Sequence, residues 1–224
     1  MESLFVTGTD TDIGKTYVTA GLAAAFYNMG IDVGVMKPFA AGTAQKSGFK
    51  SKDAEILALA AHADDPEILI NPQFFPIPAS PYTAWQNLHI EPKIDTVLSS
   101  FERLAEIHQM ILVEGMGGIM TPIRKDYFVA DMIRDMGIPA VIVTSSRIGT
   151  INHTILTVDT CKRYAIPIKG IIINNHDGGY DTGELERDLH SLLGVPVLGV
   201  IPSISLKDDL YKIFTKCLDL DLLV

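Results

Sequence analysis

The sequence predicts a doubly wound α/β fold, with a mainly parallel sheet of about six to seven strands and helices on both faces. Short apolar runs rich in Val and Ile recur along the chain, as in buried parallel strands. Helical patterns separate these runs, and polar or Gly-rich residues follow each run. With 224 residues, of which 47% are hydrophobic, the chain can bury one sizeable core, so we expect residues 1–224 to form a single domain.

The expected elements follow from these patterns in chain order. The expected strands are residues 4–6, 33–36, 111–113, 140–143, 171–173 and 197–201. The expected helices are residues 15–29, 53–63, 93–107, 129–136, 150–164 and 183–193. The Pro-rich stretch 66–81 is too rigid for a core element, so we expect a surface excursion able to cover part of the ligand crevice. Residues 206–224 predict a last helix followed by an apolar tail.

Composition limits the classes of function. The formal net charge is −9 at pH 7, whereas nucleic acid and anionic membranes require a basic surface, so we expect neither as a partner. Cys161 and Cys217 are the only cysteines and lie far apart in the sequence, which fits a reduced cytoplasmic protein without a disulfide or zinc site. The N-terminus shows no signal-peptide pattern, and no run approaches about 18 apolar residues.

The most specific motif lies between the first expected strand and the first expected helix. Residues 8–16 read GTDTDIGKT, and this context is that of a phosphate-binding loop. We expect the backbone N–H groups of residues 13–16 to face a triphosphate, the Lys15 ammonium to contact its outer phosphates and the Thr16 hydroxyl to bind Mg²⁺. The usual first glycine of the loop is Thr9 here, so the loop is a variant. The predicted fold is therefore P-loop NTPase-like.

Two carboxylates are candidate magnesium ligands. Glu114 ends an expected buried strand next to the Gly-rich residues 115–118, where a carboxylate needs a partner cation. The alternative for Glu114 is a strand-end carboxylate that faces water. Asp53 precedes Ala-Glu-Ile-Leu and is an equally good candidate for a helix N-cap. The residues alone leave both interpretations of Asp53 open.

Lys37 is a candidate catalytic residue. It follows the second expected strand and precedes Pro38, which holds the chain extended and directs the side chain toward the crevice. The alternative is a solvated surface lysine. Lys15 and Lys37 near one pocket would suit a substrate that acquires negative charge during a reaction, which favours catalysis over nucleotide binding alone.

Asn174 and Asn175 follow the fifth expected strand and are candidates for contacts with a nucleotide base. Together with His176 and Asp177 they partly resemble the guanine-reading Asn-Lys-x-Asp motif of GTPases, but Asn175 replaces the lysine. We therefore expect hydrogen bonds to a purine edge, without guanine specificity.

Several segments together resemble the dethiobiotin synthetase family. They read TGTDTDIGKT (7–16), KPFAAG (37–42), KDA (52–54), Ala-Ser-Pro (79–81), VEGMGG (113–118, with Pro122 after it) and GTINH (149–153). They run in the order of the family and span nearly the whole chain. The phosphate loop alone is shared by many enzymes, whereas its Gly-Thr-Asp-Thr version followed by Lys-Pro and Glu-Gly-x-Gly-Gly is specific.

The resemblance implies an ATP-dependent cyclo-ligase of biotin biosynthesis. 7,8-Diaminononanoate, CO₂ and MgATP would give dethiobiotin, ADP and phosphate, through a carbamate that takes the γ-phosphoryl group before the ring closes. Lys15 and Lys37 would stabilise the carbamate and phosphoryl charge, and Thr16, Asp53 and Glu114 would bind Mg²⁺. Phosphoryl transfer depends mainly on positioning and charge neutralisation, which agrees with these residue types.

The same resemblance implies further contacts. Those implied at the nucleotide are Asp12, Ile13, Gly14, Lys15, Thr16, Tyr17, Asp53, Glu114, Gly115, Met116, Gly117, Asn174, Asn175, Pro202 and Ser203. Those implied at the diamine are Thr11, Lys37, Ala41, Gly117, Gly149, Thr150, Ile151 and Asn152. Residues 149–152 would begin a helix whose N–H groups bind the substrate carboxylate of the partner subunit, so a homodimer would share the site. Ala41 stands where the family commonly has a serine.

Two alternatives share the broad fold. A partitioning or positioning ATPase switch typically carries an additional lysine near the start of the loop, and residues 6–10 contain none. A cobyrinate amidase-like enzyme would add a glutaminase domain with a nucleophilic cysteine, and neither Cys161 nor Cys217 has that context. The resemblance to dethiobiotin synthetases is therefore the preferred interpretation.

Overall fold

The computed structural model describes residues 3–175, 178–205 and 207–224. Its strands are β1 (Leu4–Gly8), β2 (Val33–Met36), β3 (Phe39–Ala41), β4 (Gln73–Phe75), β5 (Met110–Glu114), β6 (Pro122–Arg124), β7 (Tyr127–Phe128), β8 (Ala140–Ser145), β9 (Ile168–Asn175) and β10 (Val197–Pro202). Its helices are α1 (Lys15–Asn28), α2 (Lys52–Ala61), α3 (Glu67–Ile70), α4 (Pro81–Leu88), α5 (Ile94–Ile107), α6 (Val129–Met136), α7 (Thr150–Arg163), α8 (Thr182–Leu193) and α9 (Leu210–Cys217), with a short 3-10 helix η1 (Leu220–Leu222). Every expected strand and helix overlaps one of these elements. In the described ranges, no helix has both the length and the apolar character needed to cross a membrane.

The central sheet is parallel, with β1 in its interior. Within the described residues, six strands form it in the order β10-β9-β8-β1-β5-β2, and each neighbouring pair is parallel. The chain places β2 and β5 on one side of β1 first, and then β8, β9 and β10 on the other side. In such sheets, ligands bind beyond the carboxyl ends of the strands where the order reverses, which is where the loop after β1 lies. The predicted doubly wound fold is confirmed.

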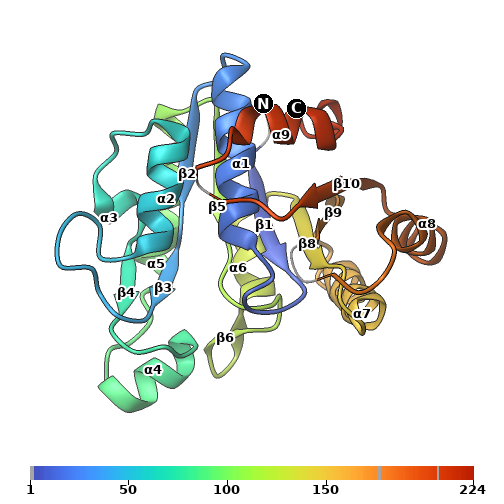
Figure 1. Cartoon of the computed structure of the whole chain (residues 1–224). Helices are drawn as coiled ribbons and strands as arrows, with labels where there is room; N and C mark the ends of the chain where they lie inside the picture. The colour runs from blue at the N-terminus through green and yellow to red at the C-terminus, as the bar shows by residue number, and fades with distance from the viewer. Residues whose placement is uncertain (1–2, 176–177, 206) are drawn as a thin grey trace.

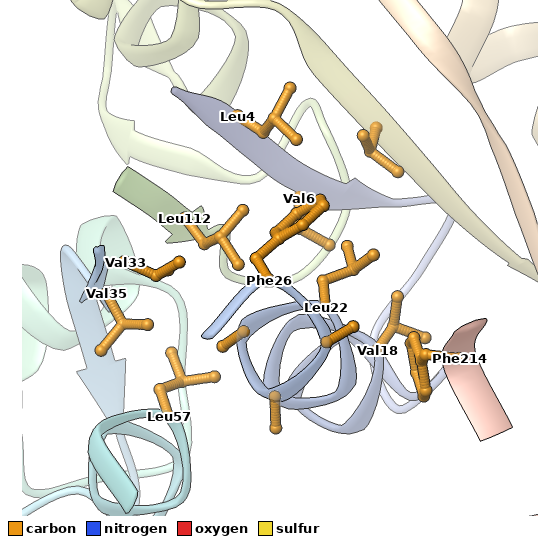
Figure 2. Close-up of a cluster of buried hydrophobic side chains, with 14 of the residues drawn as sticks. Leu4, Val6, Val18, Leu22, Phe26, Val33, Val35, Leu57, Leu112 and Phe214 are labelled. Carbon is orange, nitrogen blue, oxygen red and sulfur yellow. The ribbon is translucent and has the colours of Figure 1, made fainter. Parts of the chain in front are cut away.

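Helices cover both faces of this sheet (Figure 1). Leu4 and Val6 of β1 pack on one face with α1, α2 and α9, while Phe5 packs on the opposite face with α5, α6, α7 and α8. Figure 2 shows Leu22 and Phe26 of α1 lying against Leu4 and Val6, and all of these side chains are fully buried. Alternation along β1 follows from the two-residue period of a strand. Burial on both faces explains why the strands are nearly continuous apolar runs.

Gly21 allows α9 to pack closely on the middle of α1. A Cβ atom on Gly21 would lie 2.0 Å from Cε2 of Phe214, a fully buried side chain of α9. Figure 2 shows Phe214 beside Val18 of α1. The helix α9 confirms the expected last helix, and the apolar tail after it includes η1 and the buried Leu223. Leu206, where the expected helix begins, lies outside the described residues.

The Pro-rich stretch 66–81 contributes to the core, so the expectation that it holds no core element is wrong. It contains α3 and β4, and Ile70 and Phe75 are fully buried. β4 pairs with β3 in a parallel two-stranded sheet. Pro66 precedes α3 and Pro81 is the first residue of α4, where the missing N–H costs no helical hydrogen bond. The prolines therefore delimit short elements instead of preventing them.

His108 connects three elements near the amino ends of β2 and β5. Its ring nitrogens lie 2.8 Å from Oδ1 of Asp32 and 3.0 Å from Oδ2 of Asp65, and we call these three residues the His108 cluster. Burial alone would lower the pKa of His108, but the two carboxylates outweigh it and raise the pKa. The ring also lies against Gly34, where a Cβ would be 2.5 Å from Cδ2. The cluster ties the start of β2 to the end of α5 and to the α2–α3 connection.

Candidate active site

The loop after β1 is braced by the end of β9. Gly14, the N-cap of α1, has φ 92°, in the left-handed region that favours glycine. A Cβ there would lie 2.0 Å from Nδ2 of Asn174, which donates to the Ile13 carbonyl over 2.8 Å. Within the described residues no side chain caps α1, so its first N–H groups are free of a capping bond. The loop and the helix start therefore form a site suited to an anion.

Lys15, the first residue of α1, lies over this loop. Its Nζ donates to the carbonyl oxygen of Asp10 over 2.7 Å, and the residue is 7% exposed. Burial, together with the positive charge of Lys37, lowers the pKa of Lys15 to about 8. A bound triphosphate would supply the negative charge that restores a stable ammonium group.

Lys37 and Glu114 form a buried ion pair at the carboxyl ends of β2 and β5. Nζ of Lys37 lies 2.6 Å from Oε1 of Glu114 and 3.3 Å from Oδ2 of Asp53, and it donates to the Gly115 carbonyl over 3.1 Å. Oε1 of Glu114 also accepts from the Thr16 hydroxyl over 2.8 Å. Burial alone would lower the pKa of Lys37, but the two carboxylates outweigh it and raise the pKa. Lys37 is 4% exposed and Glu114 is 1% exposed, so neither is a solvated surface group.

The oxygen atoms of this cluster fit a hard divalent cation. Oε2 of Glu114 is buried without a hydrogen-bond partner among the described residues, although an unpaired carboxylate oxygen is costly to bury. Thr16 and Asp53 line the same cavity as Glu114. Mg²⁺ usually takes one or two carboxylates and completes its shell with phosphates and water. No group of three or more His, Cys, Asp or Glu residues in the described part of the chain could hold a metal by itself.

Asp53 does not cap α2, so that interpretation of the sequence is wrong. Ser51 is the N-cap, and its hydroxyl accepts from the Ala54 N–H over 3.3 Å. Asp53 lies in the first turn of α2, where the helix dipole favours a carboxylate, and 45% of its side chain is exposed. This position leaves the carboxylate free to face Lys37.

The cluster lines a cavity of about 800 Å³ at the carboxyl edge of the sheet. In Figure 1, α4 and β6 lie at the same end of the molecule as the loop between β1 and α1. The expected site residues that line this cavity are Thr11, Asp12, Gly14, Lys15, Thr16, Tyr17, Lys37, Ala41, Asp53, Glu114, Met116 and Gly117. Candidates for phosphate, metal and diamine contacts therefore come together in one place. Ile13 and Gly115 are buried and do not line the cavity, but their carbonyls accept bonds from Asn174 and Lys37, respectively.

The expected base-side residues lie at the ends of β9 and β10, outside this cavity. They are Asn174, Asn175, Pro202 and Ser203. Asn174 is 5% exposed, and Oδ1 of Asn175 accepts from the Ser146 hydroxyl over 2.6 Å. Pro202 lies opposite Asn175 in the sheet register, so the four residues form one group beside the phosphate loop. His176 and Asp177 lie outside the described residues.

The start of α7 also lies outside this cavity, so the cavity of one chain does not include the residues expected to bind the substrate carboxylate. These are Gly149, Thr150, Ile151 and Asn152. Gly149 has φ 95°, and no side chain in the described residues caps the helix. Two apolar side chains of this region are on the surface: Ile148, just before α7, is 83% exposed, and Leu156, in the middle of α7, is 58% exposed.

Threonine hydroxyls join the loop after β1 to α7. Oγ1 of Thr144, at the end of β8, contacts Oγ1 of Thr150 and lies 2.9 Å from Oγ1 of Thr154. Thr154 donates to the Thr150 carbonyl over 2.7 Å. Oγ1 of Thr9 lies 3.4 Å from Oγ1 of Thr144, so these hydroxyls extend to the phosphate loop. Thr144, Thr150 and Thr154 are buried, and the network is therefore largely shielded from solvent.

Part of the cavity wall was not among the expected site residues. The additional lining residues are Ala40, Lys52, Ile56, Pro78, Ala79, Ser80, Thr121 and Pro122. Most of these residues belong to, or adjoin, the segments that carry the family resemblance, so the resemblance could have identified them as site residues. Ile56 gave no such signal, because only the packing of α2 beside the loop brings its side chain to the cavity.

Similar proteins identify the family of this chain. A family model described as an AAA domain matches residues 2–209. The ATP-dependent dethiobiotin synthetase BioD of Nitrosopumilus maritimus is 65% identical over 225 residues, which cover 98% of this chain and 98% of that protein. The chain belongs to the dethiobiotin synthetase family. A second dethiobiotin synthetase, from Thermodesulfovibrio yellowstonii, is 37% identical over 233 residues and covers 98% of this chain and 97% of its own length.

Solved structures show the fold that this dethiobiotin synthetase family member shares with other proteins. The cell division ATPase MinD of Pyrococcus furiosus has a TM-score of 0.56 at 17% identity, covering 96% of each chain. A ParA family ATPase from Chlorobium tepidum has a TM-score of 0.53 at 18% identity, covering 91% of this chain and 84% of its own. These likenesses confirm the predicted P-loop NTPase-like fold, and at such identities they show the fold alone.

Proposed function

We propose that this protein is a cyclo-ligase that makes dethiobiotin from 7,8-diaminononanoate, CO₂ and ATP, releasing ADP and phosphate. Membership of the dethiobiotin synthetase family supports the reaction. The observation that carries the chemistry is the buried Lys37–Glu114 pair, which shares one cavity with Lys15 and the phosphate loop. We further propose that residues 1–224 form one P-loop domain that acts in the cytoplasm.

In this proposal the loop between β1 and α1 holds the triphosphate of ATP. The free N–H groups at the start of α1 and the Lys15 ammonium provide positive charge, and a bound phosphate raises the pKa of Lys15 from about 8. Thr16, Asp53 and Glu114 would hold Mg²⁺, which when bound neutralises phosphate charge. Asp12, Tyr17 and Met116 line the same cavity and complete the proposed nucleotide contacts.

Lys37 offsets the charge of the reacting oxygens. One amine of the diamine attacks CO₂, a C–N bond forms and the nitrogen loses a proton, leaving a carbamate. A carbamate oxygen attacks the γ-phosphorus, and the P–O bond to ADP breaks. The second amine then attacks the carbamate carbon, the C–O bond to phosphate breaks, and the cyclic urea remains after a second proton is lost. The Lys37 ammonium is a suitable counter-charge, because its carboxylate neighbours raise its pKa.

The diamine site is proposed to be shared between two copies of the chain. Thr11, Ala41 and Gly117 line the cavity and are proposed to lie near the diamine. Residues 149–152 of the second copy would bind its carboxylate through the uncapped N–H groups of α7. The exposed apolar Ile148 beside this helix start supports a surface that is covered in a homodimer.

The base of ATP is proposed to lie beside the ends of β9 and β10, near Asn175, Pro202 and Ser203. The bond from Asn174 to the phosphate loop supports this proposal, because it places the base-side residues next to the triphosphate site. Asn175 stands where a guanine-reading motif has lysine, and so the proposal is a purine contact without guanine specificity.

The alternative functions have less support. A switch ATPase of the MinD or ParA kind is supported only by the shared fold. A glutaminase-type nucleophile would require a reactive cysteine, but burial raises the pKa of the Cys161 thiol to about 12. Cys217 lies on α9, which packs on α1 and β10, and Cys217 does not line the cavity that contains Lys15, Lys37 and Glu114.

The test is direct formation of the product. The purified protein is incubated with diaminononanoate, ¹³C-bicarbonate and MgATP, and mass spectrometry follows labelled dethiobiotin while a coupled assay follows ADP. The expected result is one labelled carbon in each dethiobiotin and one ADP released for each. Lys37→Ala should lower the rate of product formation by about 100- to 1,000-fold, whereas Lys216→Ala, which changes an exposed lysine on α9, should leave the rate unchanged.

One outcome would refute the proposed reaction, and another would refute only the site shared between two copies. Hydrolysis of ATP at the same rate without the diamine, with no ureido product, would favour the switch ATPase. A protein that is strictly monomeric in sizing chromatography and fully active in kinetics would contradict the shared site, but it would not contradict the reaction itself.

A further inference from the structure

Residues 70 and 71 hold both backbone polar groups of Lys37. The Lys37 N–H donates to the Ile70 carbonyl over 2.7 Å, and the Lys37 carbonyl accepts from Nδ2 of Asn71 over 2.6 Å. Lys37 lies between β2 and β3 and precedes Pro38, which has no N–H. The backbone of this cavity residue is therefore fixed by the Pro-rich stretch 66–81.

Asn71 is buried where it makes this contact, at 5% exposure. Its Nδ2 also lies 3.3 Å from the Gln73 carbonyl, and its backbone N–H donates to the Glu67 carbonyl over 2.6 Å. Both neighbours of Nδ2 are carbonyl oxygens, which only accept, so the nitrogen must be the atom that faces them. Oδ1 is consequently on the other side, where it is buried without a hydrogen-bond partner in the described part of the chain.

The unpaired Oδ1 of Asn71 indicates that the amide is present for its Nδ2 donor and not for its oxygen. Burying a polar atom without a partner is unfavourable, and an apolar side chain of similar volume would avoid this cost. Such a side chain could not donate to the Lys37 carbonyl. The donor that faces Lys37 is therefore the property that distinguishes Asn71 from a residue that only fills space.

We infer that Asn71 is a positioning residue for Lys37, fixing its backbone so that Nζ stays paired with Glu114 in the wall of the cavity. The inference rests on the proposed function, because that function places Lys37 in the reaction. Lys37 is 4% exposed, so its four-carbon stem is confined by packing and the position of Nζ depends on where its backbone is held. Nζ is 2.6 Å from Glu114 and 3.1 Å from the Gly115 carbonyl, and movement of the backbone changes both distances. A displacement of about 1 Å can slow a reaction about 100-fold.

Two substitutions test this inference. Asn71→Ala removes the donor, and Asn71→Asp keeps the shape while replacing the donor with a carboxylate oxygen. Both should lower kcat for dethiobiotin formation by about 10- to 100-fold and leave KM for ATP unchanged, because Asn71 does not line the cavity. The matched control is Asn28→Ala, which removes an Nδ2 bond of 2.8 Å to the Ala24 carbonyl at the far end of α1 and should leave kcat unchanged.

Two further measurements separate positioning from a general structural role. In a Lys37→Ala background, Asn71→Ala should cause no additional loss of kcat, because the side chain that it positions is gone. A protonated carboxyl group has an O–H that can donate to the Lys37 carbonyl again, and burial raises the pKa of a carboxyl. The activity of Asn71→Asp relative to wild type should therefore rise as the pH falls.

The outcomes are distinguishable. Wild-type protein that makes no dethiobiotin would overturn the proposed function itself. If the wild type is active, a normal kcat in folded Asn71→Ala overturns the positioning role, and so does a full additional loss in the Lys37→Ala background. If Asn71→Ala does not fold, Asn71→Asp decides: relative activity that rises with falling pH supports the role, and a flat ratio contradicts it.

Discussion

Replacing Glu114 with glutamine should destabilise the nucleotide-free protein much more than replacing Asp53 with asparagine. Both changes remove one negative charge next to Lys37 and keep the shape of the side chain. Glu114 has 1% of its side chain exposed at 2.6 Å from Nζ, whereas Asp53 has 45% exposed at 3.3 Å. Removing a buried partner leaves the other charge uncompensated, whereas solvent screens an exposed one.

The expected difference follows from the two environments. Breaking a buried pair costs about 3–5 kcal/mol. We expect about 3 kcal/mol for Glu114→Gln, because Lys37 keeps the Gly115 carbonyl at 3.1 Å and Asp53 at 3.3 Å. For Asp53→Asn we expect at most about 1 kcal/mol. The difference between the free energies of unfolding of the two variants should therefore be about 2 kcal/mol.

Urea unfolding with a chelator and without nucleotide measures this difference. The double variant Lys37→Met with Glu114→Gln removes both charges, so it should be more stable than Glu114→Gln alone by about 1 kcal/mol or more. Equal losses from Glu114→Gln and Asp53→Asn would refute the reasoning. So would a double variant whose loss equals the sum of the two single losses.

Three further predictions concern packing and protonation. Gly21→Ala should lower the free energy of unfolding by about 1–3 kcal/mol, because its Cβ would overlap Phe214 at 2.0 Å. Gly183→Ala in α8, where the nearest atom is 3.4 Å away, should instead raise it by up to about 1 kcal/mol in the same urea assay. His108→Asn should cost more stability at pH 6 than at pH 9. Because folding raises the pKa of His108, protonated His108 stabilises the folded protein below its unfolded-state pKa, and this stabilisation disappears as the pH rises through its folded-state pKa. Equal losses of unfolding free energy at pH 6 and pH 9 would contradict this. Binding of ATP at pH 8 should take up about half a proton, because the pKa of Lys15 is about 8 and phosphate raises it. Calorimetry in buffers of different ionisation enthalpy measures this uptake, which Lys15→Met should abolish.

The elements buried in the core could be predicted with accurate bounds, because burial on both faces produces a continuous apolar run. β2 and α6 have the expected bounds of 33–36 and 129–136. The expected strand 171–173 is longer in the structure, where β9 runs from Ile168 to Asn175. Its first two residues and its last residue are half-buried, so the apolar run marks only its buried centre.

The short elements could not be predicted, because tertiary contacts rather than local periodicity hold them. β4 is three residues long and pairs with β3, and its Phe75 is fully buried although prolines surround it. α4 begins with Pro81 at its first position, which the composition of the stretch 66–81 conceals. The pairing of β3 with β4, together with the hydrogen bonds of Ile70 and Asn71 with Lys37, shows that this stretch supports the site.

The site could be predicted to the level of its strand ends, because the carboxyl ends of parallel strands meet at one edge. This rule places Lys37 and Glu114 together, but their ion pair depends on side-chain geometry that spacing does not give. The interpretation of Asp53 as an N-cap was wrong because Ser51, only two residues earlier, is the N-cap and Asp53 lies in the first turn of α2. Asn71 gave no signal at all, since its role depends on a contact across 34 residues.

The threonine hydroxyls between β8 and α7 have a fixed direction of donation, since each hydroxyl carries one proton. Thr154 gives its proton to the Thr150 carbonyl, so it can only accept from Thr144. Thr144 must then accept from Thr150, and it also presents a lone pair to Thr9. The protons therefore run from Thr150 to Thr144 and on to Thr154, and the proton of Thr154 returns to the backbone carbonyl of Thr150. Thr144→Val would keep the volume of the side chain but leave the hydroxyl protons of Thr9 and Thr150 facing a methyl group. Thr144→Ser would preserve the hydrogen-bond network.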